Sequence, residues 1–316
     1  MSNRVLVTGG AGFIGSHLVE RLIVEGFHVE VIDDLSTGRV ENLSDVWQNK
    51  KLHFAFGDIR NQQLVKICLR DVEADVHLAA IASVKKSIEE PLATHDINAS
   101  GTLNLLKASS EARVRKFVFA SSCDVYGDAH ELPISEGHPV NPLSPYAASK
   151  LAGEGYCQAF ARSYGLDTAC LRLFSVYGPR QYGGEYGGVI SRSLDRLSDN
   201  LPPLIDGDGE QYRDFIHVRD VADAVLKVLR GEKCAGEVYN IGSGKATKVN
   251  ELIRLLQRLV GKEGIEPMHL DAVSGEIRSS LADIRKAVQQ LGFGPRLELE
   301  EGLSLLVGRQ MVYADR

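Results

Sequence analysis

The sequence predicts an α/β protein in which helices cover both faces of a doubly wound parallel sheet, with a smaller α/β domain interleaved with it. Two observations carry this expectation. Short apolar runs alternate with helical patterns through residues 1–174, which is the order of strands and helices in such sheets. A further apolar run, at residues 238–242, follows a long glycine-rich stretch and is expected to rejoin the sheet. The residues between these segments therefore belong to the second domain.

Local patterns predict the individual elements. Apolar runs bounded by glycine or polar residues predict strands at residues 4–8, 27–32, 52–56, 74–78, 116–120 and 169–174. Helical patterns lie near residues 18–26, 61–70 and 94–111. Ser144 is a favoured N-cap and Pro145 suits a first helical turn, so a helix is expected from there to about Tyr164. Downstream, helices are expected at residues 218–229 and 250–260, and residues 276–316 complete the second domain.

A glycine-rich turn follows the first predicted strand. Its sequence, Gly9-Gly10-Ala11-Gly12-Phe13-Ile14-Gly15, opens a helix, so the backbone can approach a pyrophosphate that the helix N-terminus attracts. No Gly-Lys-Ser/Thr follows, which excludes an ATP-type phosphate loop. The second strand ends on Asp33, whose carboxylate could accept hydrogen bonds from an adenosine ribose and would repel the extra phosphate of NADP. The pattern favours NAD; a turn-forming aspartate at a strand end is the alternative.

Tyr146 and Lys150 lie four residues apart at the start of the helix that begins after Ser144. This spacing puts a phenol and an ammonium on one helix face, where a nearby cation lowers the pKa of the phenol. Such a pair could take a proton from a sugar hydroxyl. Ser122 follows the predicted strand 116–120 and is aimed at the same crevice. The alternatives are a half-buried ring with a solvated lysine, and a serine that forms a turn.

Composition excludes several other classes of function. The chain has 316 residues, a net charge of −6 and a pI near 5.9, which disfavour nucleic acid or an anionic membrane as the main partner. Its five cysteines are scattered and form no Cys-x-x-Cys pair, so neither a disulfide framework nor a metal site is expected. No apolar stretch is long enough to span a membrane, and we expect a cytoplasmic protein.

Several motifs occur together in this chain: residues 8–15, Asp33, Asp58-Ile59, residues 77–80, Ser121-Ser122, Tyr146-x-x-x-Lys150, residues 176–180 and residues 207–218. Together they resemble the nucleotide-sugar epimerase/dehydratase branch of the extended short-chain dehydrogenase/reductase superfamily, and most closely the pattern of UDP-glucose 4-epimerases. The resemblance covers nearly the whole chain. It implies a Rossmann-type NAD-binding domain at residues 1–174 and 217–242, and a nucleotide-sugar-binding domain at residues 175–216 and 243–316.

The resemblance also implies a reaction. A hydride passes from C4 of a UDP-sugar to NAD while Tyr146, as phenolate, accepts the proton of the 4-hydroxyl; the 4-keto sugar then turns over and takes the hydride on its other face. Ser122 hydrogen-bonds the 4-oxygen, and Lys150 holds the nicotinamide ribose and lowers the phenol pKa. The implied cofactor-binding residues are Gly9, Gly12, Phe13, Ile14, Gly15, Asp33, Asp34, Ser36, Thr37, Gly38, Asp58, Ile59, Leu78, Ala79, Ala80, Asn98, Tyr146 and Lys150. The implied substrate-binding residues are Ser83, Ser122, Cys123, Asp124, Tyr146, Ser175, Arg180, Val189, Arg213, Glu276 and Ser280.

The pair Cys123-Asp124 departs from the pattern of the 4-epimerases, in which these two residues are generally uncharged. Dehydratases and decarboxylases of the branch carry an acid at the position of Asp124, where it could remove a C5 proton from the 4-keto sugar. Cys123, however, stands where sugar 4,6-dehydratases usually have an aspartic acid. A dehydratase or decarboxylase therefore remains the alternative reaction, and an aspartate that only caps a turn remains the alternative role.

Three further departures concern the substrate. Ser175 replaces an asparagine that usually contacts the substrate phosphate, and Val273 replaces an arginine; Glu276 stands for an aspartate that contacts the uridine ribose. Ser280 occupies the position of a size gate beside the sugar 2-substituent, so UDP-GlcNAc and UDP-GalNAc could be substrates as well as UDP-glucose and UDP-galactose. The substrate phosphates are then expected to be bound by Arg213 together with Arg180, Arg192 or Arg278.

Two expectations concern the assembly. Relatives commonly dimerise through the helix that carries Tyr146 and the helix near residues 94–111, and Gly153 and Gly155 would let a neighbouring helix pack closely. We therefore expect a homodimer. A non-catalytic NAD-binding scaffold is the alternative from another class, but such proteins have usually lost the Tyr or the Lys that this chain retains.

Overall fold

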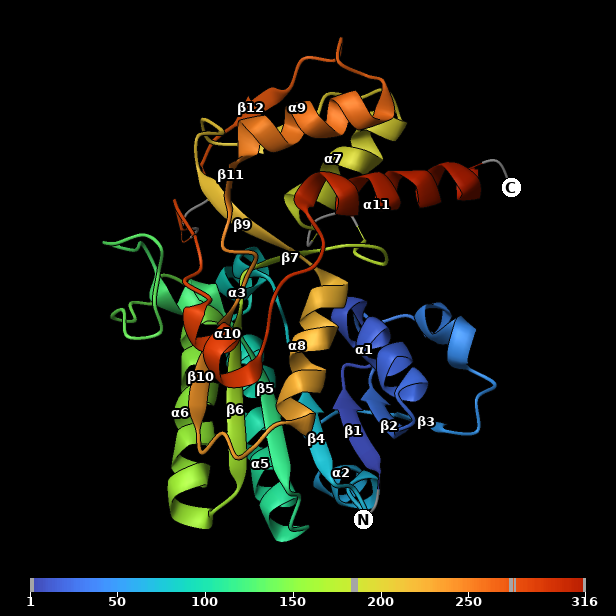
Figure 1. Ribbon diagram of the computed structural model, residues 1–316, viewed down its shortest axis with the longest axis vertical. Helices are drawn as coiled ribbons and strands as arrows, with labels where there is room; N and C mark the ends of the chain where they lie inside the picture. The colour runs from blue at the N-terminus through green and yellow to red at the C-terminus, as the bar shows by residue number, and fades with distance from the viewer. Residues whose placement is uncertain (1–2, 183–186, 273–274, 276, 315–316) are drawn as a thin grey trace.

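The computed structural model describes residues 3–182, 187–272, 275 and 277–314. Figure 1 shows two parts: a large parallel sheet flanked by helices, and a smaller part formed by α7, α9, α11 and short strands. Within the described ranges, no helix is both long and apolar enough to cross a membrane.

The large sheet has seven parallel strands in the order β10-β6-β5-β4-β1-β2-β3. The order reverses at β1, which lies between β4 and β2, and ligands of such sheets bind at the carboxyl ends of the strands beside this reversal. All the predicted strands are confirmed to within two residues. Their bounds are β1 Arg4–Thr8, β2 His28–Asp33, β3 Leu52–Phe56, β4 Ala74–His77, β5 Lys116–Ser122, β6 Asp167–Leu173 and β10 Glu237–Ile241.

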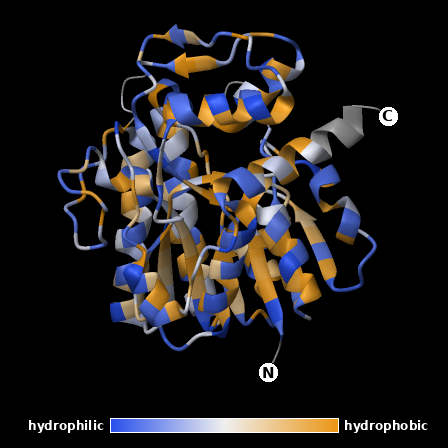
Figure 2. Cartoon of the chain, turned by 45° about the horizontal axis from the view of Figure 1, so that its top comes forward, coloured by the Kyte–Doolittle hydropathy of each residue, from blue (hydrophilic) through white to orange (hydrophobic). Residues whose placement is uncertain are grey.

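Hydrophobic side chains alternate between the two faces of this sheet. Val5 and Val7 belong to the core under α1 and α8, whereas Leu6 belongs to the core under α2, α5 and α6. Figure 2 accordingly shows strands that are mainly hydrophobic and helices with mixed surfaces. The helices of this part are α1 Phe13–Val24, α2 Gln62–Cys68, α3 Val84–Glu89, α4 Pro91–His95, α5 Gly101–Glu111, α6 Pro145–Tyr164, α8 Val218–Arg230 and α10 Arg285–Leu291, with short 3-10 helices η1 Val40–Val46 and η3 Cys123–Tyr126.

The smaller part has its own hydrophobic core. Helices α7, α9 and α11 pack with a three-stranded sheet, β11-β9-β7, and a second, two-stranded sheet pairs β12 with β8. The bounds are α7 Val189–Ser198, α9 Val249–Val260, α11 Leu299–Ala314, β7 Ser175–Tyr177, β8 Leu204–Asp206, β9 Tyr212–His217, β11 Ala246–Lys248 and β12 Met268–Leu270.

Three features differ from the expected elements. One helix was expected at residues 94–111, but this segment consists of α4, a π-helical turn at Asp96–Ser100 and α5. The spacing of apolar residues does not predict a π-helical turn. Helices α3 and α7 were not expected. Helix α10 was expected in the second domain, but it contacts β10 and α8, because Ala287 and Phe293 are buried in the core of the large sheet. The division into two domains, with α10 moved to the larger one, stays a proposal.

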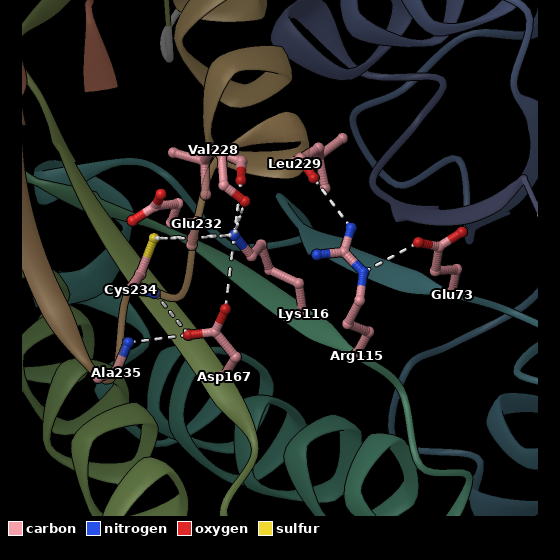
Figure 3. Close-up of polar contacts among 10 residues, drawn as sticks. Glu73, Arg115, Lys116, Asp167, Val228, Leu229, Glu232, Cys234 and Ala235 are labelled. Carbon is pink, nitrogen blue, oxygen red and sulfur yellow. Dashed lines mark hydrogen bonds and ion pairs between the residues drawn. The ribbon is translucent and has the colours of Figure 1, made fainter. Parts of the chain in front are cut away.

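A fully buried lysine fixes the end of α8 to the large sheet (Figure 3). The ammonium group of Lys116, on β5, donates hydrogen bonds to the carbonyl oxygens of Val228 (2.8 Å), Gly231 (3.2 Å) and Glu232 (2.7 Å). It also lies 3.4 Å from a carboxylate oxygen of Asp167. A cation at this place satisfies one carbonyl in the last turn of α8 and two carbonyls that follow the helix, and it complements the helix dipole.

We expect Lys116→Met to lower the free energy of unfolding by about 3 kcal/mol or more, because it leaves a buried carboxylate and several carbonyls without their cation. Urea unfolding measures this change. Lys107→Met is the matched control, since its side chain is mostly exposed and its pairing with Glu111 spans 4.0 Å; it should change the free energy of unfolding little. Equal effects of the two substitutions would contradict this account of Lys116.

Candidate active site

The glycine-rich turn is closely packed against the neighbouring strand end. A Cβ atom at Gly15 would lie 2.0 Å from the carbonyl oxygen of Gly9, and one at Gly9 would lie 2.8 Å from the backbone nitrogen of Ala79. Gly9 also has a φ of +70°, which side chains rarely adopt. Gly12 caps α1 without a side-chain hydrogen bond, so its first turn presents backbone N–H groups at the mouth of the crevice. This cradle fits the pyrophosphate of a dinucleotide.

Asp33 ends β2 beside this turn. Its carboxylate accepts hydrogen bonds from the backbone nitrogens of Ala11 (2.9 Å) and Leu35 (2.9 Å). Burial raises the pKa of the Asp33 carboxyl, and these N–H groups oppose the rise. Gly38 packs against the same carboxylate, where a Cβ atom would lie 2.8 Å from Oδ1. Asp33 is thus held next to the phosphate cradle, where it fits the ribose hydroxyls of NAD.

The other residues expected at the cofactor surround this crevice. Leu78, Ala79 and Ala80 follow β4, and the backbones of Leu78 and Ala79 lie against Gly9. Ile59 is buried, while Asp58 forms an ion pair with Arg60. Asp34, Ser36 and Thr37 lie in the exposed turn after β2, in which Asp34 accepts hydrogen bonds from Ser36. Phe13 and Ile14 open α1.

Asn98, in the π-helical turn, makes its hydrogen bonds within the protein. Its carboxamide oxygen accepts from the backbone nitrogen of Ile81 (2.8 Å), and its nitrogen donates to the carbonyl of Ile81 (3.0 Å) and to Ser149 Oγ (3.0 Å). Ser149 belongs to α6. Asn98 therefore ties the segment after β4 to the helix that carries Tyr146, and its contact with a cofactor stays a prediction.

The structure brings the predicted reactive residues together. Helix α6 begins at Pro145, with Ser144 as its N-cap, and its first turn carries Tyr146. The hydroxyl of Ser122, at the end of β5, lies close enough to the phenol of Tyr146 to lower the pKa of that phenol. It also accepts from the backbone nitrogen of Asp124 (3.2 Å). Ser122, Asp124 and Tyr146 thus form one polar cluster at the carboxyl end of β5.

The electrostatics of this cluster differ from the expectation. Burial raises the pKa of the Tyr146 phenol above its usual range, and the charge of Asp124 raises it further, while the hydrogen bond from Ser122 opposes both. Lys150 does not contact the phenol; its ammonium donates to the carbonyl oxygen of Ala120 (2.8 Å), and burial lowers its pKa to about 8. Lys150 is not among the groups that change the phenol pKa in this structure, so its expected lowering of that pKa stays a prediction. The charge with the largest effect on the phenol is that of an acid, Asp124.

A cavity of about 370 Å³ opens beside the cluster, between the large sheet and the smaller part. Asp124 lies in its wall and so connects the cavity with Ser122 and Tyr146. Burial raises the pKa of the Asp124 carboxyl, and the positive charge of Arg213 opposes this rise. The described lining residues are Ala82, Val84, Asp124, Ser175, Val176, Tyr177, Gln181, Gly187, Gly188, Val189, Ile190, Arg192, Asp206, Gln211, Arg213, Phe215, Val249 and Ile277.

Four of the residues expected at the substrate line this cavity: Asp124, Ser175, Val189 and Arg213. Arg192 also lines it and pairs with Asp206 at 2.9 Å, so it is the one of the three alternative phosphate-binding arginines that reaches the cavity wall. Gln211 was not expected. Gln211 immediately precedes β9, and Gln211, Arg213 and Phe215 are spaced two residues apart. The period of a strand therefore places them on one face, and this spacing was visible in the sequence.

Other expected substrate residues lie elsewhere. Arg180 forms ion pairs with Glu20 (2.5 Å) and Asp45 (3.6 Å), and does not line the cavity. Ser280 is fully buried and is also absent from the lining. The sequence could not report either arrangement, because both depend on the packing of distant segments.

The expected substrate residues not yet placed are Ser83, Cys123 and Glu276. Ser83 caps α3, where its side chain accepts from the backbone nitrogen of Lys86 (3.2 Å), and its two neighbours line the cavity. Cys123 is buried, and burial raises the pKa of its thiol well above the usual range. Val273 and Glu276 lie outside the described residues.

A family model described as the NAD dependent epimerase/dehydratase family matches residues 5–242 of the chain. The UDP-glucose 4-epimerase of Mycolicibacterium smegmatis is 39% identical to it over 307 residues, which cover 96% of this chain and 97% of that protein. Among solved structures, the UDP-glucose 4-epimerase of Thermotoga maritima with UDP-glucose has a TM-score of 0.92 at 39% identity, with 98% of this chain and 99% of that one covered.

Similar structures also include enzymes with other names. The UDP-N-acetylglucosamine 4-epimerase of Methanobrevibacter ruminantium has a TM-score of 0.93 at 36% identity, with 99% of both chains covered. A dTDP-glucose 4,6-dehydratase of Streptomyces venezuelae, solved with NAD, has a TM-score of 0.92 at 33% identity, with 99% of this chain and 98% of that one covered. Overall similarity therefore does not show whether this chain is an epimerase or a dehydratase. The residues of the site have to distinguish the two reactions.

Proposed function

The chain belongs to the NAD-dependent epimerase/dehydratase family, and we propose that within it the protein is a UDP-sugar 4-epimerase that interconverts UDP-glucose and UDP-galactose. The observation that carries the proposal is the cluster of Ser122, Asp124 and Tyr146 beside a cavity whose wall holds Arg213. A phenol and a hydroxyl that meet at one point can share the proton and the oxygen of one sugar hydroxyl.

In the proposed reaction, NAD supplies a hydride acceptor and donor at C4 of the sugar. Tyr146, as phenolate, takes the proton of the 4-hydroxyl as the C4 hydrogen leaves, and Ser122 donates a hydrogen bond to the 4-oxygen. The resulting 4-keto sugar turns in the cavity, receives the hydride on its other face and takes the proton back from Tyr146. Arg213 and Arg192 bind the diphosphate through charge-assisted hydrogen bonds, which keeps the intermediate bound while it turns.

Product analysis tests this proposal. The protein would be supplied with NAD and a panel of UDP-hexoses, UDP-N-acetylhexosamines and UDP-glucuronate, and the products separated and weighed by mass spectrometry. A new peak of unchanged mass supports epimerisation and names the sugar. The two N-acetylhexosamines belong in the panel because a similar structure is a UDP-N-acetylglucosamine 4-epimerase. Loss of water or carbon dioxide from a substrate would overturn the proposal.

A dehydratase or decarboxylase is the second candidate, because Asp124 lies in the cavity wall within the cluster of Ser122 and Tyr146. An acid there could remove a proton next to the 4-keto group. This candidate also has a relative, since a similar structure is a dTDP-glucose 4,6-dehydratase.

Asp124→Asn separates the two candidates. For an epimerase we expect turnover to persist and its pH dependence to move. The charge of Asp124 raises the pKa of Tyr146, so its removal lowers that pKa and shifts the rising limb of activity to lower pH. For a dehydratase we expect turnover to fall about 10³-fold, because the base itself is lost. Rates measured across pH decide between these outcomes, with Asp128→Asn, an exposed position nearby in sequence, as control.

We also propose that the protein is a cytoplasmic homodimer. Reduced thiols fit the cytoplasm, and all five cysteines are free and buried.

Gly153 was expected at the dimer surface, but a Cβ atom there would lie 2.4 Å from the ring of Phe119. This glycine therefore allows α6 to pack on its own sheet. Gly155 is exposed with no atom within 4 Å of its Cβ position, and Leu103 on α5 is 37% exposed, so both remain available to a second copy.

The dimer proposal predicts the effect of one substitution. Gly155→Arg should convert a dimer into a monomer at micromolar concentration, because a long charged side chain would separate two helices packed at this surface. Sedimentation velocity measures the change, and Gly155→Ala is the matched control that keeps the surface small. A wild-type monomer under the same conditions would contradict the proposal.

A further inference from the structure

A buried ion pair lies on α6 one turn beyond Lys150. The guanidinium of Arg172, on β6, donates to both carboxylate oxygens of Glu154, at 2.9 Å and 2.7 Å. Glu154 is 2% exposed and Arg172 is 5% exposed. Because Tyr146, Lys150 and Glu154 are spaced four residues apart, they lie along one face of α6. The ion pair therefore fixes the face of the helix that carries the phenol.

The same ion pair is bonded to the strand that ends in the reactive serine. Ser121, immediately before Ser122 on β5, donates its hydroxyl hydrogen to Glu154 at 2.5 Å. On its other side the guanidinium of Arg172 lies 4.5 Å above the ring centre of Tyr126. The hydroxyl of Tyr126 in turn donates to the side chain of Asn240, on β10, at 2.7 Å. We call Ser121, Glu154, Arg172, Tyr126 and Asn240 the clamp.

The clamp holds both ends of the turn that presents the reactive side chains. Ser121 precedes Ser122, and Tyr126 follows Asp124 by two residues, so the turn between them is fixed at its start and at its end. Tyr146 lies on the helix that is fixed by Glu154. The position of Ser122 relative to Tyr146 thus depends on one buried ion pair that touches neither of them.

We propose that Glu154 and Arg172 are positioning residues, which fix the place of Ser122 on β5 relative to Tyr146 on α6. The proposal rests on the proposed function for the meaning of that arrangement. A purely stabilising role is the competing explanation. It is weakened by the cost of removing two charges from water, which cancels much of the net stability that a buried ion pair gives.

The proposal has a consequence for proton transfer. The hydrogen bond from Ser122 lowers the pKa of the Tyr146 phenol, whereas Asp124 and Cys123, from the turn, raise it. Lys150 faces Ala120 from the same helix, and Arg213 acts on Asp124. If the clamp loosens, Ser122 moves away and the phenol loses the effect of Ser122, which lowers its pKa. The rising limb of activity then moves to higher pH.

The decisive variant is the double substitution Glu154→Leu with Arg172→Met. Replacement of a buried ion pair by apolar side chains of similar size is often nearly neutral for stability. We expect this variant to stay folded while its turnover falls about 10²-fold and its rising limb moves up by about one pH unit. Arg172→Lys keeps the positive charge but cannot donate to both carboxylate oxygens in the same way. Its turnover should lie between that of the double variant and that of the wild type.

A second readout does not depend on turnover. In protein labelled with isotope at the tyrosine rings, the resonance of Tyr146 is identified by its loss in Tyr146→Phe, and we expect it to move in the double variant. Lys116→Met is the matched control, since it removes the buried cation at the opposite end of β5; it should lower stability without moving this resonance.

The two readouts keep two failures apart. If the wild type converts no nucleotide sugar, the proposed function fails, and the resonance of Tyr146 still tests the clamp. If that resonance stays in place in the double variant and turnover falls only with the folded fraction, the pair is merely stabilising and the inference is overturned.

Discussion

Tyr146→Phe is expected to lower turnover about 10³-fold while NAD remains bound. The substitution removes only the hydroxyl oxygen, so the ring still fills its place at the start of α6, and the glycine turn and Asp33 are untouched. The substitution removes the hydroxyl group that, in the proposed reaction, takes the proton of the 4-hydroxyl beside Ser122. The rate at saturating substrate and the NAD content of the purified protein measure the two effects.

Tyr164→Phe is the matched control, because Tyr164 ends the same helix and its side chain is 67% exposed. It should leave turnover unchanged. Near-normal turnover in Tyr146→Phe would remove the phenol from the chemistry, and with it the reaction proposed here.

Gly15→Ala is expected to weaken NAD binding about 10²-fold. Its Cβ atom would lie 2.0 Å from the carbonyl oxygen of Gly9 and 2.8 Å from the Cα of Gly10, both of which are backbone atoms that cannot rotate away. The turn must therefore shift, and a strain of about 2–3 kcal/mol at the cradle corresponds to this loss of affinity. Titration of cofactor-free protein with NAD by calorimetry measures the affinity.

Gly308→Ala provides the comparison for this substitution. Gly308 also lies within a helix, α11, but no atom lies within 4 Å of its Cβ position. It should leave NAD binding unchanged and raise stability by about 1 kcal/mol, because alanine favours the helix. An unchanged NAD affinity in Gly15→Ala would mean that the turn is not the phosphate cradle.

Sequence patterns predicted the structure best where local helix, strand and turn preferences agree with the packing of the whole fold. The strand, the glycine turn and the helix of residues 4–24 form as expected because one backbone path satisfies all three patterns. Helix α6 begins where Ser144 and Pro145 predict it, and this start brings Tyr146 to Ser122. The reactive cluster was predictable because its members stand at element ends, which a parallel sheet gathers at one edge.

Features that depend on contacts between distant segments were not predictable. Arg180 forms an ion pair with Glu20, which is 160 residues away in the sequence. No local sequence pattern predicts this ion pair. The docking of α10 on the large sheet depends on a buried alanine and phenylalanine that would suit either core. The pKa of Tyr146 is raised by burial and by the charge of Asp124. The sequence spacing had instead suggested that Lys150 lowers it, but Lys150 donates to Ala120.

The most direct test of the proposed reaction uses UDP-glucose that carries deuterium at C4. The account predicts UDP-galactose of unchanged mass with the deuterium still at C4, because the hydride leaves that carbon and returns to it. A product that has lost water or carbon dioxide, or an epimer in which the deuterium has been replaced by solvent hydrogen, would contradict it.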